Sequence, residues 1–182
     1  MAEKTIYILL TDTGTWFSKL IKLYTRFPYN HASIALDEGL NDIYSFGRKV
    51  YYNPFSGGFV VENLSKGVCK KFPRCACLIY KVSVTEEQYS SLRHQVESFV
   101  KDKEKYRYNF FGLLGVLFHK GIKRKNRYFC SQFVSELLIK NNLFFNEKEP
   151  ELIRTCDLFS IENKEVIYEG SVNDFLTMKR RP

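Results

Sequence analysis

Residues 128–138 read YFCSQFVSELL, an apolar pattern of helical period with Cys130 in its opening turn. The unpaired N–H groups and the positive dipole end of a helix N-terminus favour an anion, so a thiol placed there ionises more readily to the nucleophilic thiolate. This stretch therefore predicts a helix that begins with a reactive cysteine. The alternative is a structural role, because unpaired cysteine is among the most buried residue types.

Apolar runs typical of β-strands precede this helix along most of the chain. They lie at residues 5–11, 31–36, 43–46, 59–61 and 75–84, and a last one is expected at 166–168. The acidic and glycine residues between the second and third runs predict a β-hairpin. Together the runs predict a contiguous antiparallel sheet.

Other segments repeat their apolar residues at helical spacing and are expected to cover the sheet. Residues 16–26 and 85–102 show this spacing, and Thr85 with Gln88 opens the second segment as a capping box would. Residues 110–118 are more uniformly apolar and predict a short, tightly packed helix. A length of 182 residues suits one compact core, so we expect a single α+β domain over residues 1–182.

The composition is that of a globular protein. Apolar residues make up 45% of the chain, and no apolar run reaches the roughly 20 residues that a membrane-spanning helix needs. The apolar stretch after Lys4 is too short for a secretory signal, which leads us to expect a cytoplasmic protein. The five cysteines match no disulfide scaffold and no common zinc pattern, so we expect at least one free thiol and no metal or other cofactor.

Basic residues give the chain a formal net charge of +8. Many of them lie just before the cysteine helix or at the C-terminus: Lys120, Lys123, Arg124, Lys125, Arg127, Lys179, Arg180 and Arg181. Such a run is either a solvated loop or a surface that attracts an anionic substrate or lipid, so a peripheral membrane contact stays open. No recognition-helix, zinc-finger or RNA-binding pattern is present, and no nucleic-acid partner is expected.

A histidine at the start of a strand supplies a candidate base. His31 opens the second apolar run, far from Cys130 in the sequence. A base on a sheet and a thiol at the facing end of a helix form the arrangement that papain-like enzymes use. Taken alone, each residue type more often has a structural role, but the pair predicts a nucleophile and its base. The other histidines, His94 and His119, are expected on the surface.

Three segments resemble the permuted NlpC/P60 proteins of the YiiX/YebB-like group: residues 13–21, 29–36 and 128–134. This group is similar in arrangement to lecithin:retinol acyltransferase-like enzymes. In the group the histidine strand precedes the cysteine helix, the reverse of ordinary papain-like enzymes, and the same order holds for His31 and Cys130. The resemblance spans most of the chain and implies a circularly permuted papain-like (NlpC/P60) fold, with an antiparallel sheet packed by helices.

The resemblance also implies a third polar residue on the strand that follows the histidine strand. That place falls to Ser45, whose hydroxyl can accept a hydrogen bond from the imidazole but cannot stabilise imidazolium as a carboxylate does. Asp37 or Glu38 is the alternative source of negative charge. An oxyanion hole would use the backbone N–H of Cys130 and one further donor. The candidates for that donor are Tyr29, Tyr106 and Tyr108.

The sequence thus predicts a cysteine hydrolase or acyltransferase that acts on an amide or ester through a thioacyl intermediate, with Cys130, His31 and Ser45 as its catalytic residues. The resemblance implies a small substrate, either a peptidoglycan-type peptide or a lipid acyl group, and an anionic one suits the charge of the chain. The alternative is a non-catalytic module that binds an anionic lipid or peptide on the same fold. The serine at position 45, where an acid would be expected, favours that alternative.

Overall fold

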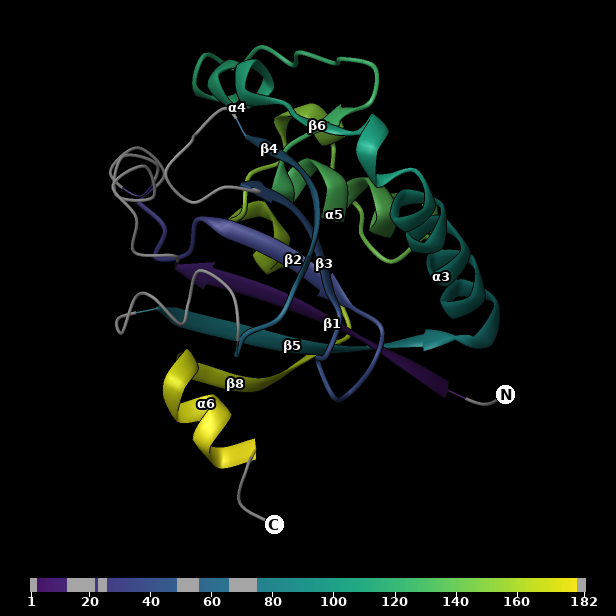
Figure 1. Cartoon of the computed structure of the whole chain (residues 1–182), viewed down its shortest axis with the longest axis vertical. Helices are drawn as coiled ribbons and strands as arrows, with labels where there is room; N and C mark the ends of the chain where they lie inside the picture. Colours follow the sequence, from purple (N-terminus) through teal and green to yellow (C-terminus); the bar gives the residue numbers. More distant parts are fainter. Residues whose placement is uncertain (1–2, 13–21, 23–25, 49–55, 66–74, 180–182) are drawn as a thin grey trace.

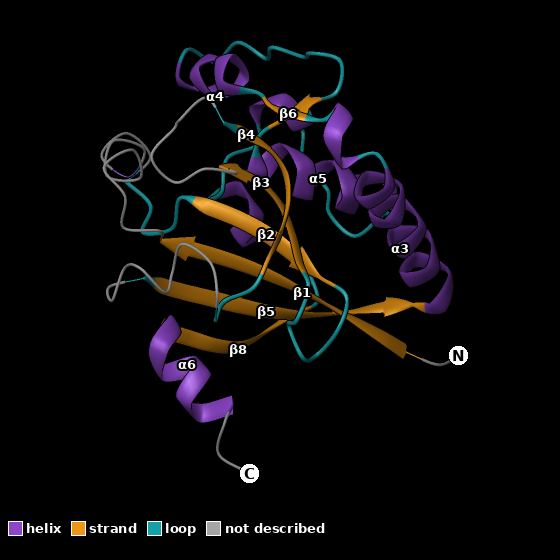
Figure 2. Cartoon of the chain, in the orientation of Figure 1, coloured by secondary structure: helices purple, strands orange, loops and turns teal. Residues whose placement is uncertain are grey.

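The computed structural model of the chain describes residues 3–12, 22, 26–48, 56–65 and 75–179. These residues form an α+β structure around a six-stranded antiparallel sheet, which confirms the predicted sheet (Figure 2). In chain order its strands are β1 (Glu3–Asp12), β2 (His31–Ala35), β3 (Ile43–Arg48), β4 (Gly57–Glu62), β5 (Ala76–Thr85) and β8 (Lys164–Ser171). Across the sheet the order is β4-β3-β2-β1-β5-β8, so β2 and β1 lie at its centre.

Strand β1 is buried on both faces of the sheet. Alternate side chains of a strand point to opposite sides of its sheet, so β1 contributes to an apolar cluster on each face. Ile6, Ile8 and Leu10 belong to one apolar cluster, whereas Tyr7 and Leu9 belong to a second one. This explains why β1 is apolar along nearly its whole length instead of alternating with polar residues.

Helices cover the two faces of the sheet unequally (Figure 1). The larger cluster takes apolar side chains from α3 (Glu86–Lys101) and α5 (Cys130–Lys140), and the smaller one from α6 (Val172–Lys179). Another helix, α4 (Phe110–Leu117), lies at one end of the molecule above a two-stranded parallel sheet of β6 (Arg107–Tyr108) and β7 (Arg127–Tyr128). Short 3-10 helices follow at η1 (Lys103–Lys105), η2 (Pro150–Leu152) and η3 (Asp157–Ser160).

Most predicted elements that fall on described residues are present. The β2–β3 hairpin forms, α4 spans 110–117, and α3 begins at the predicted capping box, where Thr85 and Gln88 exchange side-chain to backbone hydrogen bonds. The helix predicted over 16–26 falls mainly outside the described residues. The last strand is longer than predicted. Helix α6 was not predicted, because its few apolar residues give it a weak helical pattern.

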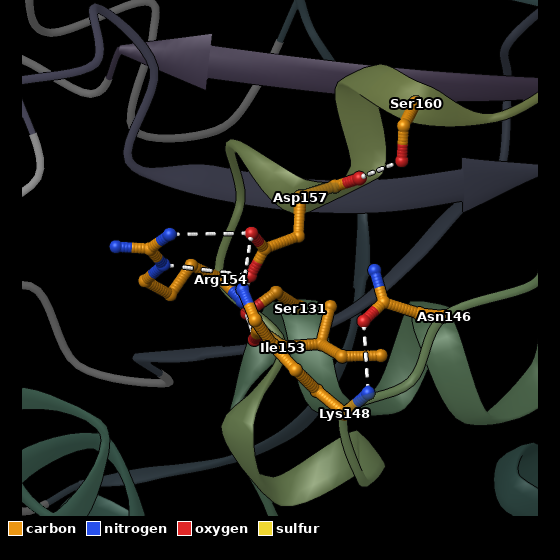
Figure 3. A network of polar contacts seen from close by, with 7 residues as sticks. All are labelled: Ser131, Asn146, Lys148, Ile153, Arg154, Asp157 and Ser160. Atoms are coloured by element: carbon orange, nitrogen blue, oxygen red, sulfur yellow. Dashed lines mark hydrogen bonds and ion pairs between the residues drawn. The ribbon is translucent and has the colours of Figure 1, made fainter. Parts of the chain in front are cut away.

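A polar network holds residues 146–160, the segment that follows the cysteine helix α5 in the chain (Figure 3). Ser131 donates its hydroxyl to the carbonyl of Ile153 at 2.7 Å, which ties the first turn of α5 to this segment. Asp157, whose side chain is 11% exposed, accepts hydrogen bonds from the backbone N–H of Arg154 and from Lys148, both at 2.8 Å. Burial alone would raise the pKa of Asp157, but Lys148 and Arg154 hold it below its ordinary value.

We expect Asp157→Asn to lower the free energy of unfolding by about 1 to 3 kcal/mol at neutral pH, because it removes the charge of a half-buried ion pair. A carboxyl with a lowered folded pKa contributes stability above its unfolded value, and that stability is lost as the pH falls through the folded value. The difference between the two proteins, measured by urea unfolding, should therefore shrink below about pH 4. Glu165→Gln, which removes an exposed ion pair with Lys81, serves as the control and should change little.

Candidate active site

Cys130 is the first residue of α5, as the sequence predicted. The preceding Phe129 has extended backbone angles and no polar side chain that could cap the helix. The first N–H groups of α5 therefore remain available near the sulfur, and the N–H of Ser131 hydrogen-bonds to it. The thiol group of Cys130 lies in a protected position, since the residue is 5% exposed.

His31 opens β2, and its imidazole is hydrogen-bonded to the thiol of Cys130. The structure therefore brings together two residues from distant parts of the chain, the predicted nucleophile and its base. The other side of the ring faces a carboxylate: Nε2 of His31 lies 3.1 Å from Oε2 of Glu62. Because Nε2 is engaged in this way, Nδ1 is the nitrogen left for the thiol.

Glu62, the last residue of β4, takes the role that the sequence analysis gave to Ser45. That assignment to Ser45 is corrected by the strand register. Strand β2 pairs with β3 through Ile34 and Tyr44, so position 45 comes opposite position 33 and not opposite His31. The hydroxyl of Ser45 is fully buried and donates to the carbonyl of Ala32 at 2.7 Å.

The two acidic alternatives in the β2–β3 turn also lie elsewhere. Asp37 accepts hydrogen bonds from the backbone and side chain of Asn41. The carbonyl of Glu38 accepts one from Lys179. A sequence signal for Glu62 existed, because a carboxylate directly follows the predicted strand at 59–61. Only the order of strands in the sheet shows that this strand end approaches His31.

Glycine at position 47 leaves space for the His31–Glu62 pair. A Cβ at this position would lie 3.3 Å from Oε1 of Glu62 and 3.7 Å from Cε1 of His31. A larger side chain would have to displace one of these two groups, since 3.3 Å is already a tight contact. Gly47 is therefore part of what lets the carboxylate reach the imidazole.

The charges of the site shift the ionisation of His31 and of Cys130. Burial would lower the pKa of His31, but the carboxylate of Glu62 and the hydrogen bond to Cys130 raise it well above its ordinary value. Burial would likewise raise the pKa of Cys130, yet the hydrogen bond and positive charge of His31 and the N–H groups of Ala32 and Ser131 lower it. Both directions favour a thiolate–imidazolium pair, which is the reactive form of a cysteine nucleophile.

Of the three tyrosines considered as oxyanion donors, Tyr108 is the one that reaches the nucleophile. Its hydroxyl is hydrogen-bonded to Cys130, and burial with the nearby sulfur raises the pKa of this tyrosine well above the ordinary value. Tyr29 instead donates to Glu169 at 2.8 Å, and Tyr106 packs on Phe99. Tyr108 is held close by Gly57, where an added Cβ would come within 2.5 Å of the Tyr108 Cβ.

The other free thiols in the described part of the chain have raised pKa values, in contrast to Cys130. Cys77 and Cys156 are free, as expected for part of the set, but burial raises the pKa of Cys77 to about 12 and also raises the pKa of Cys156. Cys75 is disulfide-bonded, which the sequence analysis did not predict. Among the described cysteines, Cys130 is the one with a lowered pKa. His94 and His119 are exposed, as predicted.

Within the described residues, no group of three or more histidine, cysteine or acidic side chains is arranged to hold a metal ion. In the same part of the chain, no helix has the length and apolar character needed to span a membrane. Comparisons with protein-family models, with curated proteins and with solved structures found no match to this chain.

Proposed function

We propose that this protein is a cysteine hydrolase or acyltransferase with a circularly permuted papain-like fold. The observation that carries the proposal is the series Cys130–His31–Glu62, a thiol, an imidazole and a carboxylate joined by hydrogen bonds. These residues come from α5, β2 and β4, so the tertiary structure assembles them. A nucleophile, a base and a third group that orients the base form the common pattern of covalent catalysis by hydrolases.

The reaction would proceed in two steps. The Cys130 thiolate attacks the carbonyl carbon of an amide or ester, and imidazolium of His31 then donates its proton to the leaving amine or alcohol as the bond to the carbonyl breaks. The resulting acyl-thioenzyme is attacked by water or by an acceptor alcohol or amine, whose proton passes to His31. The thiolate leaves, and the enzyme returns to its starting state. Glu62 stabilises imidazolium and holds the ring in place throughout.

The oxyanion formed in each step would be stabilised by the backbone N–H of Cys130 and the hydroxyl of Tyr108. Both groups lie at the sulfur, one at the start of α5 and the other on β6. A phenol of raised pKa stays protonated at neutral pH and can donate a hydrogen bond. In this proposal Tyr108 is the second oxyanion donor, which the sequence left open.

We expect Tyr108→Phe to lower kcat by about 10- to 100-fold, because removal of one oxyanion donor weakens binding of the transition state more than that of the substrate. Alkylation of Cys130 has no oxyanion, so its rate should change much less than kcat. Both rates are measured on the same preparation, with Tyr106→Phe as the control. Equal losses in the two rates would show that Tyr108 acts on the thiol and not on the oxyanion.

The substrate classes stay as proposed from the resemblance, either a peptidoglycan-type peptide amide or a lipid acyl ester. A screen of acyl and peptide substrates with rapid acid quench and intact-protein mass spectrometry tests the proposal directly. The acyl group should be trapped on Cys130 in the native chain and should be absent from Cys130→Ala. Cys77 and Cys156 provide internal controls, since their raised pKa values keep them protonated near neutral pH. A substrate that turns over equally well in Cys130→Ala would contradict the mechanism.

The rival proposal, a non-catalytic binding module, is weakened by the position of Glu62. It was favoured by a serine where an acid was expected, and the structure supplies the acid from β4 instead. A binding module has no need for a thiol of lowered pKa next to a histidine of raised pKa. Alkylation of Cys130 only above about pH 8.5, as for an ordinary thiol, would favour the binding module.

A cytoplasmic location stays a prediction. The disulfide at Cys75 counts against it, because stable disulfides are typical of oxidising compartments. Cell fractionation of the expressed protein, with blocking of free thiols before lysis, would decide between the cytoplasm and an oxidising compartment.

A further inference from the structure

A surface at one end of the molecule combines exposed apolar side chains with basic ones. We call it the α4 surface and define it by α4 and the loop that follows, residues 110–125. Phe111 is 60% exposed, Phe118 74% and Ile122 37%. Exposed basic side chains lie directly beside them in the loop: Lys120, Lys123 and Lys125. In Figures 1 and 2 this surface lies at the end of the molecule opposite α6.

The loop is fixed against the helix, so the apolar and basic residues form one built surface. At the end of α4 the N–H of Lys120 donates to the carbonyl of Gly115 at 2.9 Å. At its start, Asn109 is fully buried, caps the N–H of Gly112 at 3.0 Å and donates to the carbonyl of Ile122 at 2.9 Å. The loop therefore runs back along the whole helix.

The guanidinium of Arg124 completes this arrangement. It lies over the ring of Phe111, 5.4 Å from the ring centre, so charge and apolar surface meet side by side. Such a pairing lets the apolar ring enter an apolar phase while the cation stays at its polar boundary.

The charge along the chain segment that forms this surface has one sign. Residues 105–135 contain no aspartate or glutamate but seven lysines and arginines: Lys105, Arg107, Lys120, Lys123, Arg124, Lys125 and Arg127. Lys123 lies 3.6 Å from Glu151, whose side chain is only 6% exposed and so offers little negative charge to the outside. Two copies of the chain meeting through this surface would bring like charges together, which disfavours self-association.

We propose that the α4 surface docks on an anionic lipid bilayer. Apolar side chains beside lysines and arginines are the pattern of segments that lie in a membrane interface, where the rings enter the acyl boundary and the cations meet lipid phosphates. Nucleic acid would use the charge but leave Phe118 exposed to water, whereas a bilayer uses both. The proposal depends on exposure and charge and stands whether or not the chain is an enzyme.

Docking would also place the candidate active site close to the bilayer. Tyr108 precedes α4 by two residues and is hydrogen-bonded to Cys130, and β7 joins the basic loop to α5. The surface and the site are thus connected through a few residues at both ends of the loop.

The test is co-sedimentation of the full chain with vesicles of phosphatidylcholine alone and with vesicles that also contain phosphatidylglycerol. We expect binding to the anionic vesicles that weakens as salt is added. Lys120→Gln combined with Lys125→Gln should weaken it about 25-fold, at about fivefold for each charge removed. The control removes two charges elsewhere, Lys4→Gln with Lys81→Gln, and should retain most of the binding.

Phe118→Ser tests the apolar part and should weaken binding by at least about tenfold, with Met178→Ser on α6 as its control. All six substituted side chains are at least partly exposed, and unchanged alkylation of Cys130 verifies folding and the site independently of docking. Absence of binding to anionic vesicles, or equal binding of the α4-surface variants and their controls, overturns the proposal. Failure of the acyl-trapping experiment would leave this result unaffected.

Discussion

Replacing His31 by alanine is expected to slow alkylation of Cys130 by iodoacetamide about 100-fold at pH 6.5. The hydrogen bond and charge of His31 are the largest contributions that lower the pKa of this buried thiol. Without them, burial raises the pKa above the ordinary value of about 8.5, and at most about 1% of the thiol is ionised at pH 6.5. Acyl transfer should fall further, by more than about 1,000-fold, because the same change removes the proton donor for the leaving group.

The measurement is the rate of carbamidomethylation of Cys130, followed by peptide mass spectrometry from pH 5 to 10. His94→Ala is the matched control, since His94 is exposed on α3. Cys156 in the same samples reports general reactivity, because its pKa is raised. A pH profile for Cys130 that is identical in the native chain and in His31→Ala would contradict the thiolate–imidazolium pair.

Replacing Glu62 by glutamine is expected to lower kcat by about 100-fold and to narrow the pH profile from both sides. The carboxylate raises the pKa of His31, so its loss moves the high-pH limb, where imidazolium deprotonates, to lower pH. A His31 that is less often charged stabilises the thiolate less, so the pKa of Cys130 rises and the low-pH limb moves to higher pH. A purely structural role for Glu62 would lower activity at all pH values without moving the limbs.

Three variants distinguish Glu62 from the residues that the sequence suggested. Asp37→Asn and Glu38→Gln should leave the pH profile unchanged, because both residues are engaged in or near the β2–β3 turn. Ser45→Ala should lower the stability of the fold, since it leaves the Ala32 carbonyl without its buried donor, and should not move the limbs. Movement of the limbs in Ser45→Ala but not in Glu62→Gln would restore the original assignment.

Local patterns predicted the elements of the site well. The apolar period after Tyr128 placed Cys130 at the start of α5, and the apolar run after Asn30 placed His31 at the start of β2. Both positions depend on neighbours within a few residues, which sequence periodicity records. The capping box at Thr85 and the β2–β3 turn are predictable for the same reason.

The third residue of the site, Glu62, could not be predicted from local patterns. The assignment to Ser45 required the register of β2 against β3, and a difference of two residues places a side chain about 7 Å along the strand. The register found opposes His31 to position 47, where a glycine leaves space, and the carboxylate arrives from β4 instead. Tyr108 likewise reaches Cys130 because β6 packs against β4 at Gly57.

Local sequence patterns are enough to predict an antiparallel sheet covered by helices, with a cysteine at a helix start and a histidine at a strand start. These features follow from local spacing, capping and turn chemistry, which act over a few residues. The positions of Glu62 and Tyr108 beside Cys130 and His31, and the path of the basic loop back along α4, come from the tertiary structure. Those contacts depend on strand order, on register and on space left by glycines, which are set by the packing of the whole chain.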